Sequence, residues 1–124
     1  MKSEMKNFDI TTVKFNNRGL VSVISQDAET LEVLMLAWMN AESLKETLAT
    51  GRMTFWSRSR QAFWRKGESS GHVQTLKDMR IDCDRDCLLA LVEQVGPACH
   101  TNRRSCFYTA LRDGEEVELS QPEG

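Results

Sequence analysis

The sequence lacks the segments that would place it in a membrane or direct it out of the cell. No apolar run approaches the roughly 18 residues that a membrane-spanning helix needs. The N-terminal stretch MKSEMKNFDI has no apolar segment after its lysines, so it does not resemble a signal peptide. We therefore expect a cytoplasmic protein, in which the 4 cysteines are more often metal ligands or buried thiols than disulfides.

An excess of charge of one sign is also missing. The 124 residues include 16 lysines and arginines and 18 acidic residues, which gives a formal net charge of -2. This balance argues against nucleic acid as a partner, because domains that bind it usually carry a basic excess. Basic residues are nevertheless concentrated between Arg52 and Arg80, where only Glu68 and Asp78 are acidic. That distribution favours a small phosphorylated ligand.

Repeats and low-complexity linkers are absent, and the length fits one domain over residues 1–124. We expect its core at about 18–110 and flexible ends at 1–8 and 113–124. Asn40 should cap a short helix over 41–50 that stops at Gly51. The pattern indicates a strand-rich α+β fold with mostly antiparallel pairing. The predicted strands are 20–26, 31–39, 53–59, 62–66, 72–82, 87–95 and 105–111.

The segment IDCDRDC at 81–87 holds the densest set of candidate metal ligands. If the preceding strand continues through it, the aspartates share one face and the cysteines share the other. Carboxylates suit Mg²⁺ or Ca²⁺ and thiolates suit Zn²⁺, so two sites are more natural than one. Positions four apart on a strand are about 13 Å apart, so the aspartates can bind one ion only if the strand bends. The residues concerned are Asp82, Asp84, Asp86, Cys83 and Cys87.

Two other interpretations of these aspartates are open. With Glu93 they have the spacing of calcium ligands in an EF-hand, but Cys87 occupies the position at which that loop needs glycine. A solvated acidic strand end would need no metal at all.

The other two cysteines, Cys99 and Cys106, lie in the segment GPACHTNRRSCFY. Their spacing within a loop lets two thiolates converge on one metal ion. A third thiolate, from Cys83 or Cys87, would leave a zinc ion with an open position for water, whereas all four would close the site. No pair has the spacing CxxC, so buried inert thiols are the alternative.

Both histidines lie beside these candidate sites. His100 follows Cys99 and could accept a proton from a zinc-bound water, and His72 could do likewise or bind phosphate. An ordinary strand-end histidine is the alternative for His72. The blocks WSRSR and WRKGESSGH suit a nucleotide, although their alternation also fits a hairpin with inward aromatics. The candidate ligand-binding residues are Trp56, Ser57, Arg58, Arg60, Lys66, Glu68, Ser70 and Gly71.

Four blocks in order, WSRSR, WRKGESSGH, DCDRD and GPACHTNRRSCFY, resemble the phosphoribosyl-AMP cyclohydrolases of histidine biosynthesis over about residues 18–108. The resemblance implies an intertwined homodimer with a pseudobarrel-like antiparallel sheet capped by a short helix. The implied reaction hydrolyses the N1–C6 bond of N1-(5-phosphoribosyl)-AMP, the third step of the pathway. It opens the adenine ring to give the formimino-AICAR ribonucleotide.

The resemblance also implies roles for individual residues. His100 would be the general base, and Cys87 lies outside the pattern and receives no role. Three carboxylates would hold magnesium: Asp82, Asp84 and Asp86. Three thiolates would hold one zinc ion, the last of them from the second subunit: Cys99, Cys106 and Cys83.

Two other classes of protein are alternatives. A zinc-dependent base deaminase would carry the motifs H-x-E and P-C-x-x-C, and neither occurs in the sequence. A non-catalytic zinc module that binds RNA would close its metal site with all four cysteines, including Cys87, and its RNA binding would be sensitive to salt.

Overall fold

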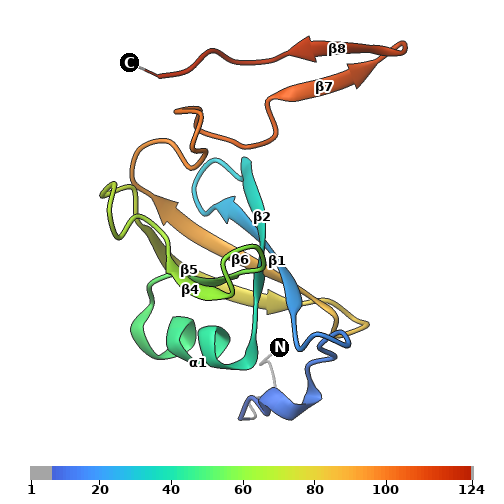
Figure 1. Cartoon of the computed structure of the whole chain (residues 1–124), viewed down its shortest axis with the longest axis vertical. Helices are drawn as coiled ribbons and strands as arrows, with labels where there is room; N and C mark the ends of the chain where they lie inside the picture. Colours follow the sequence, from blue (N-terminus) through green and yellow to red (C-terminus); the bar gives the residue numbers. More distant parts are fainter. Residues whose placement is uncertain (1–6, 124) are drawn as a thin grey trace, which may run out of the picture.

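A four-stranded β-sheet forms the centre of the computed structural model, which describes residues 7–123 (Figure 1). The two outer pairs, β1–β2 and β5–β6, are antiparallel hairpins, as predicted. The central pair, β1–β6, is parallel, because a long excursion that contains the helix separates these strands. The strands lie in the order β2 (Val33–Met39), β1 (Val21–Asp27), β6 (Cys87–Gln94) and β5 (Gln74–Ile81).

Two smaller antiparallel sheets accompany the central one, and one 3₁₀ turn precedes it. A fold rich in strands with a single α-helix in the described part confirms the predicted α+β class. The additional elements are η1 (Ile10–Thr12), β3 (Thr54–Ser57), β4 (Ala62–Arg65), β7 (Thr109–Arg112) and β8 (Glu115–Glu118).

The helix α1 (Ala41–Thr50) has the predicted ends. The Asn40 side chain accepts a hydrogen bond from the Ser43 amide at 2.8 Å, and the Ser43 hydroxyl accepts one from the Asn40 amide at 3.0 Å. Gly51 ends the helix in the left-handed conformation, with φ of 76°. Within residues 7–123 no helix combines the length and apolar character required to cross a bilayer.

One hydrophobic core lies between the central sheet, α1 and β3. Val21 and Val23 point into it from β1, and Leu44 and Phe55 close it from the helix and β3. The inward row of β1 turns polar at its C-terminal end, where Ser25 and Asp27 are also buried. Buried polar groups need hydrogen-bond partners, and these partners lead to the candidate site.

Some boundaries differ from the predictions. The strand predicted at 72–82 ends at Ile81, and residues 82–86 form a tight turn instead of an extended segment. The strand predicted at 105–111 begins only at Thr109. The segment 113–124, predicted to be flexible, contains β8. Of the predicted flexible N-terminus, residues 1–6 lie outside the described residues.

Candidate active site

A pocket of about 600 Å³ lies between the loop at 66–72 and the loop at 96–106. It brings together both histidines, two of the four cysteines and several cationic side chains, which are far apart in the sequence. The predicted site residues that line it are Arg60, Lys66, Glu68, Ser70, His72, Cys99, His100 and Cys106.

Cys99 and Cys106 both line this pocket, and the Cys99 sulfur lies 3.0 Å from the Thr101 hydroxyl oxygen. The chain reverses between them, because the amide of Cys99 donates to the carbonyl of Arg103 at 3.0 Å. Although desolvation opposes the shift, hydrogen bonds from Thr101 lower the pKa of the Cys99 thiol. Desolvation and the neighbouring Cys99 raise the pKa of Cys106 to about 11. The two pKa values are thus shifted in opposite directions, and a soft cation bound between the two sulfurs would favour the thiolate form of both.

Lys66 joins the two loops that form the pocket. Its ammonium donates to the carbonyl of Ala98 and lies 5.4 Å from the centre of the Trp64 ring. Burial lowers the pKa of this ammonium, while the two cysteines oppose the shift. A partly desolvated cation at this position attracts an anionic ligand strongly, since little water screens it.

Two glycines allow His72 to approach the pocket wall closely. A Cβ atom on Gly96 would lie 2.7 Å from Cδ2 of the His72 ring. A Cβ atom on Gly67, which has φ of 81°, would lie 2.4 Å from the backbone carbon of His72. Only glycine fits at these two positions, so His72 is held between the two loops.

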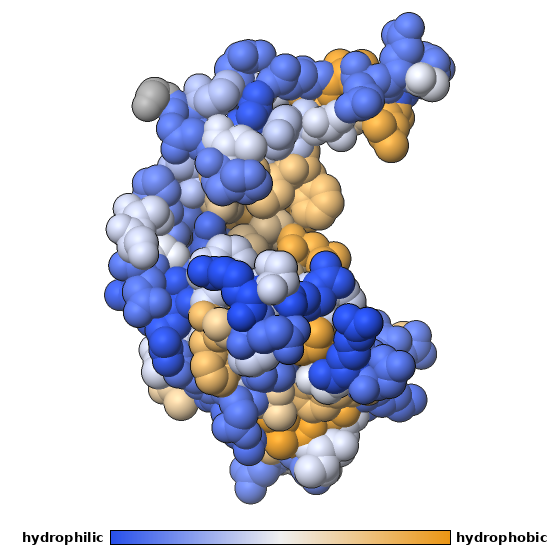
Figure 2. Space-filling view, in the orientation of Figure 1, coloured by the Kyte–Doolittle hydropathy of each residue, from blue (hydrophilic) through white to orange (hydrophobic). Residues whose placement is uncertain are grey.

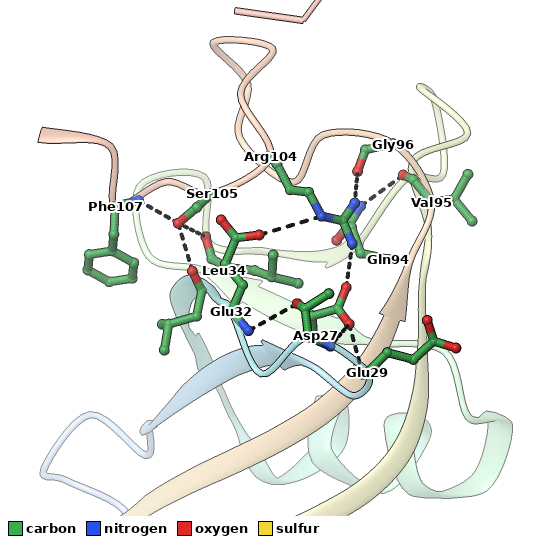
Figure 3. Close-up of polar contacts among 12 residues, drawn as sticks. Asp27, Glu29, Glu32, Leu34, Gln94, Val95, Gly96, Arg104, Ser105 and Phe107 are labelled. Atoms are coloured by element: carbon green, nitrogen blue, oxygen red, sulfur yellow. Dashed lines mark hydrogen bonds and ion pairs between the residues drawn. The ribbon is translucent and has the colours of Figure 1, made fainter. Parts of the chain in front are cut away.

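The loop that carries Cys99 and Cys106 is fixed to the sheet through Arg104 (Figure 3). The Arg104 guanidinium binds the carboxylate of Asp27, donates to the carbonyl of Gly96 at 3.3 Å and lies 3.6 Å from Glu32. Asp27 is only 6% exposed and also accepts the amides of Glu29 and Thr30. The pKa of Asp27 lies below its usual value, chiefly because its carboxylate accepts the Thr30 amide. Desolvation opposes this shift, and the Glu29 amide and Arg104 add to it.

The adjacent residues complete this anchor. The Ser105 hydroxyl donates to the carbonyl of Val33 at 2.7 Å and accepts the amide of Phe107 at 2.9 Å (Figure 3). The Cys106 amide donates to the carbonyl of Leu34 at 2.7 Å. Cys106 is therefore positioned by the edge of β2, and Cys99 by the loop that Arg104 holds.

The three aspartates come together in the turn between β5 and β6. Their carboxylate oxygens lie within 4.8 Å of one another, and all three residues are exposed. Arg85 adopts φ of 62°, which allows the amides of Asp86 and Cys87 to reach the carboxylate of Asp82. The premise that the aspartates and cysteines alternate on two faces of a strand is therefore wrong. The chain bends at residues 82–86, and this bend brings the three carboxylates close enough to bind one ion.

The electrostatics of the turn favour a cation. A hydrogen bond with Asp82 and the negative charges of Asp82 and Asp84 raise the pKa of Asp86. The pKa of Asp82 is lowered, because hydrogen bonds from Asp86, Cys87 and Arg85 outweigh desolvation. Repelling carboxylates of this kind can hold a divalent ion that prefers oxygen ligands.

Cys83 lies in this turn, at the opposite end of β6 from Cys99 and Cys106. The eight residues of β6, Cys87–Gln94, span roughly 23 Å at about 3.3 Å per residue. One copy of the chain therefore does not bring Cys83 to the two pocket cysteines. Cys87 is the first residue of β6 and is half-buried, whereas Cys83 lies in the preceding turn and is exposed.

Other predicted ligand-binding residues line a second cavity, of about 480 Å³. Trp56, Ser57 and Arg58 lie here, and the Arg58 guanidinium stacks on the Trp38 ring at 4.8 Å. Trp64 lines both cavities and therefore forms the wall between them. Gly71 is the one predicted binding residue that lines neither.

Sequence reasoning missed a buried polar ladder behind the pocket. Gln74 is fully buried; its amide donates to Gln94 at 2.7 Å and accepts the Ser25 hydroxyl at 2.9 Å. Gln94 in turn donates to the carbonyl of His72 at 3.3 Å. A glutamine inside a strand gives no such signal by itself, because the ladder depends on the β1–β6–β5 pairing.

A strand-rich α+β fold whose polar pocket gathers thiol, imidazole and cationic groups defines an enzyme for a small anionic substrate. The chain belongs to the phosphoribosyl-AMP cyclohydrolase family, whose model matches residues 35–108. A phosphoribosyl-AMP cyclohydrolase of Roseobacter denitrificans is 71% identical over 94% of this chain and 91% of its own length. Those of Ruegeria sp. (strain TM1040) and Paracoccus denitrificans are 66% and 63% identical, over 96% and 94% of this chain and 92% and 96% of their own lengths. The resemblance inferred from four sequence blocks is thus confirmed.

Proposed function

We propose that this chain, as a single domain over residues 1–124, hydrolyses the N1–C6 bond of N1-(5-phosphoribosyl)-AMP. This ring opening gives the formimino-AICAR ribonucleotide in the third step of histidine biosynthesis. The observation that carries the proposal is one pocket that combines Cys99, Cys106, His100 and the desolvated cation of Lys66. We place the reaction in the cytoplasm, where these thiols stay reduced.

The two pocket cysteines fit a zinc site. Both line the same pocket and each influences the pKa of the other, so one cation could bind both sulfurs in place of their protons. Bound zinc would supply a Lewis acid that makes a water molecule nucleophilic near neutral pH. Two thiolates leave the site short of a third protein ligand.

The third ligand in this proposal is Cys83 of the partner subunit. Within one copy, the length of β6 separates Cys83 from Cys99. Cys83 is exposed on its turn and is therefore accessible to a second copy. The homodimer is thus part of the proposed active site: each copy would complete the pocket of the other.

The aspartate turn fits a magnesium ion. Asp82, Asp84 and Asp86 offer hard oxygen ligands, and a divalent cation would relieve the repulsion that raises the pKa of Asp86. If Cys83 reaches the partner's pocket, this turn accompanies it. The carboxylates would then lie beside the bound nucleotide, where magnesium would neutralise phosphate charge.

The residues of the chain have distinct tasks in the proposed reaction. His100 accepts the proton of the water that attacks C6 of the purine ring, and the N1–C6 bond then breaks. His72, clamped between Gly67 and Gly96, binds or orients the substrate from the opposite loop. Lys66 and Arg60 bind phosphate in the pocket.

The substrate carries two ribose phosphates. One would bind at Lys66 and Arg60, and the second cavity provides room for the other. Arg58 and Ser57 supply donors for an anion, and Trp56 and Trp38 supply aromatic faces. Because Trp64 borders both cavities, a nucleotide that spans them would pass along this side chain.

A direct assay tests the function. The purified protein is incubated with phosphoribosyl-AMP, and the ultraviolet absorbance change of ring opening is followed with and without a chelator. We expect turnover that the chelator abolishes and added zinc restores. Release of ammonia would indicate a deaminase instead, because ring opening liberates none. Loss of zinc in Cys87→Ala would indicate the closed four-cysteine site of a binding module.

A further inference from the structure

The hairpin β7–β8 stands apart from the rest of the molecule. It forms its own two-stranded sheet and projects away from the central sheet (Figure 1). It also lies beyond residues 35–108, the part that the family model matches. A two-stranded hairpin is marginally stable by itself in water and becomes more stable when it packs against another surface.

The hairpin and its flanks expose large apolar side chains to solvent. Leu111 is 81% exposed, Leu119 52% and Phe107 55%. We call residues 107–119 the C-terminal arm. Figure 2 shows the arm overhanging a hollow, with apolar surface both on the arm and on the body below it. On the body, the edge strand β2 exposes Val33 and Leu36, and the arm leaves the body beside β2.

The charges of the arm and of the body beside β2 are complementary. Residues 109–118 contain four acidic side chains, three of them on β8, and the single cation Arg112. Leu36 and the exposed cation Arg18 line the same cavity, and Arg18 is not among the residues proposed to bind the substrate. The same chain therefore presents an apolar, acidic arm and an apolar surface flanked by a cation. Two such surfaces on one chain are what a two-fold symmetric contact requires.

The base of the arm is fixed to the cysteine loop. The Arg103 guanidinium stacks on the Tyr108 ring at 3.9 Å and pairs with Glu118. The Leu119 amide donates to the carbonyl of Tyr108 at 2.7 Å. Because the carbonyl of Arg103 also accepts the Cys99 amide, a contact made by the arm bears directly on the cysteine loop.

From this geometry we propose that the C-terminal arm clasps a second copy of the chain. Its apolar residues pack over Val33 and Leu36 of the partner subunit, with β8 directed toward the partner's Arg18. The proposal rests on the proposed homodimer and goes beyond it, because it assigns the contact to a segment outside the matched family domain. The arm would hold the dimer together while its base holds the loop that carries Cys99.

The test compares Leu111→Asp with the matched control Leu48→Asp in sedimentation equilibrium. Leu48 is also an exposed leucine, 42% accessible, but lies on α1 beside a different apolar cavity. We expect Leu111→Asp to raise the dimer dissociation constant by roughly tenfold or more, and Leu48→Asp to leave it unchanged. Circular dichroism confirms that both variants are folded.

A second variant keeps the test decisive if Leu111→Asp fails to fold. Glu116→Lys changes only an exposed charge and should weaken the dimer severalfold. A dimer that both arm variants leave unchanged would overturn the arm while the homodimer stands. Dissociation by Leu48→Asp alone would place the interface at the cavity beside α1 instead. A monomeric wild-type protein would overturn the homodimer itself and the arm with it.

Discussion

The two ends of β6 carry two different kinds of candidate metal ligand. At its start, the turn 82–86 gathers three exposed carboxylates; at its end, the loop 96–106 places two thiols in a pocket. The strand between them spans roughly 23 Å, so the two sets stay apart within one copy. Hard and soft ligands are therefore separated by the length of a strand and not by its two faces. Cys83 is a thiol at the carboxylate end, and in the proposed site it reaches the pocket cysteines of a second copy.

The largest effect should come from the thiol end. His100→Ala removes the proposed proton acceptor, and we expect kcat to fall roughly 10²- to 10⁴-fold with little change in KM. The zinc content should stay the same, because His100 is not among the proposed ligands. Steady-state kinetics and metal analysis measure both quantities, with Lys14→Ala as a surface control. An unchanged kcat would remove His100 from the chemistry.

A change among the carboxylates at the start of β6 should reduce activity less than the loss of His100, and it should do so by weakening magnesium binding. Asp84→Asn leaves the hydrogen bonds of Asp82 intact and should weaken magnesium binding, with a drop of roughly 10- to 100-fold in kcat/KM. Bound zinc should be unaffected. Asp78→Asn, another exposed aspartate on the adjacent strand, is the matched control. If Asp84→Asn instead released zinc, the two ends would not hold separate ions.

A third change tests the anchor that fixes the cysteine loop to the central sheet. Arg104→Lys keeps the charge but loses the planar fork that contacts Asp27 and Gly96 together. We expect the free energy of unfolding to fall by about 1–3 kcal/mol and zinc affinity to fall roughly tenfold. Arg80→Lys, in an exposed pair with Asp78, should change neither quantity. Normal zinc affinity in a destabilised Arg104→Lys would limit Arg104 to a role in stability.

The smallest effect is the pH dependence of that anchor. The pKa of Asp27 is lowered in the folded state, so its carboxylate contributes stability above its ordinary pKa of 3.8. That contribution is lost as the pH falls from there through the lowered folded pKa. Urea unfolding of wild type and Asp27→Asn at pH 7 and pH 3 should therefore show a difference that shrinks in acid. An equal difference at both values would contradict the assignment.

The sequence predicted more of the residues that line the pocket than of the geometry that brings them together. Its motifs singled out Cys99, Cys106 and His100, which line one pocket, and local rules placed the helix between Asn40 and Gly51. Alternation failed at 82–86, because the turn depends on a left-handed Arg85, a conformation that non-glycine residues rarely adopt.

Long-range structure was harder to predict for a physical reason. The parallel pairing of β1 with β6 joins segments about 65 residues apart, and nothing local encodes it. The roles of Arg104 and Gln74 depend on that pairing, because their partners lie on other strands. The strand β8 was hidden in an acidic stretch whose composition is typical of a flexible tail.

The central claim, that the thiol site is completed by a second copy, is best tested by mixing two inactive variants. Cys83→Ser and Cys99→Ser are each purified, checked for activity, then mixed under conditions that exchange subunits. If the site is shared, each mixed dimer regains one intact site, and the activity should recover to roughly a quarter of the wild-type value. Activity that stays at the level of the separate variants after proven subunit exchange would contradict the account.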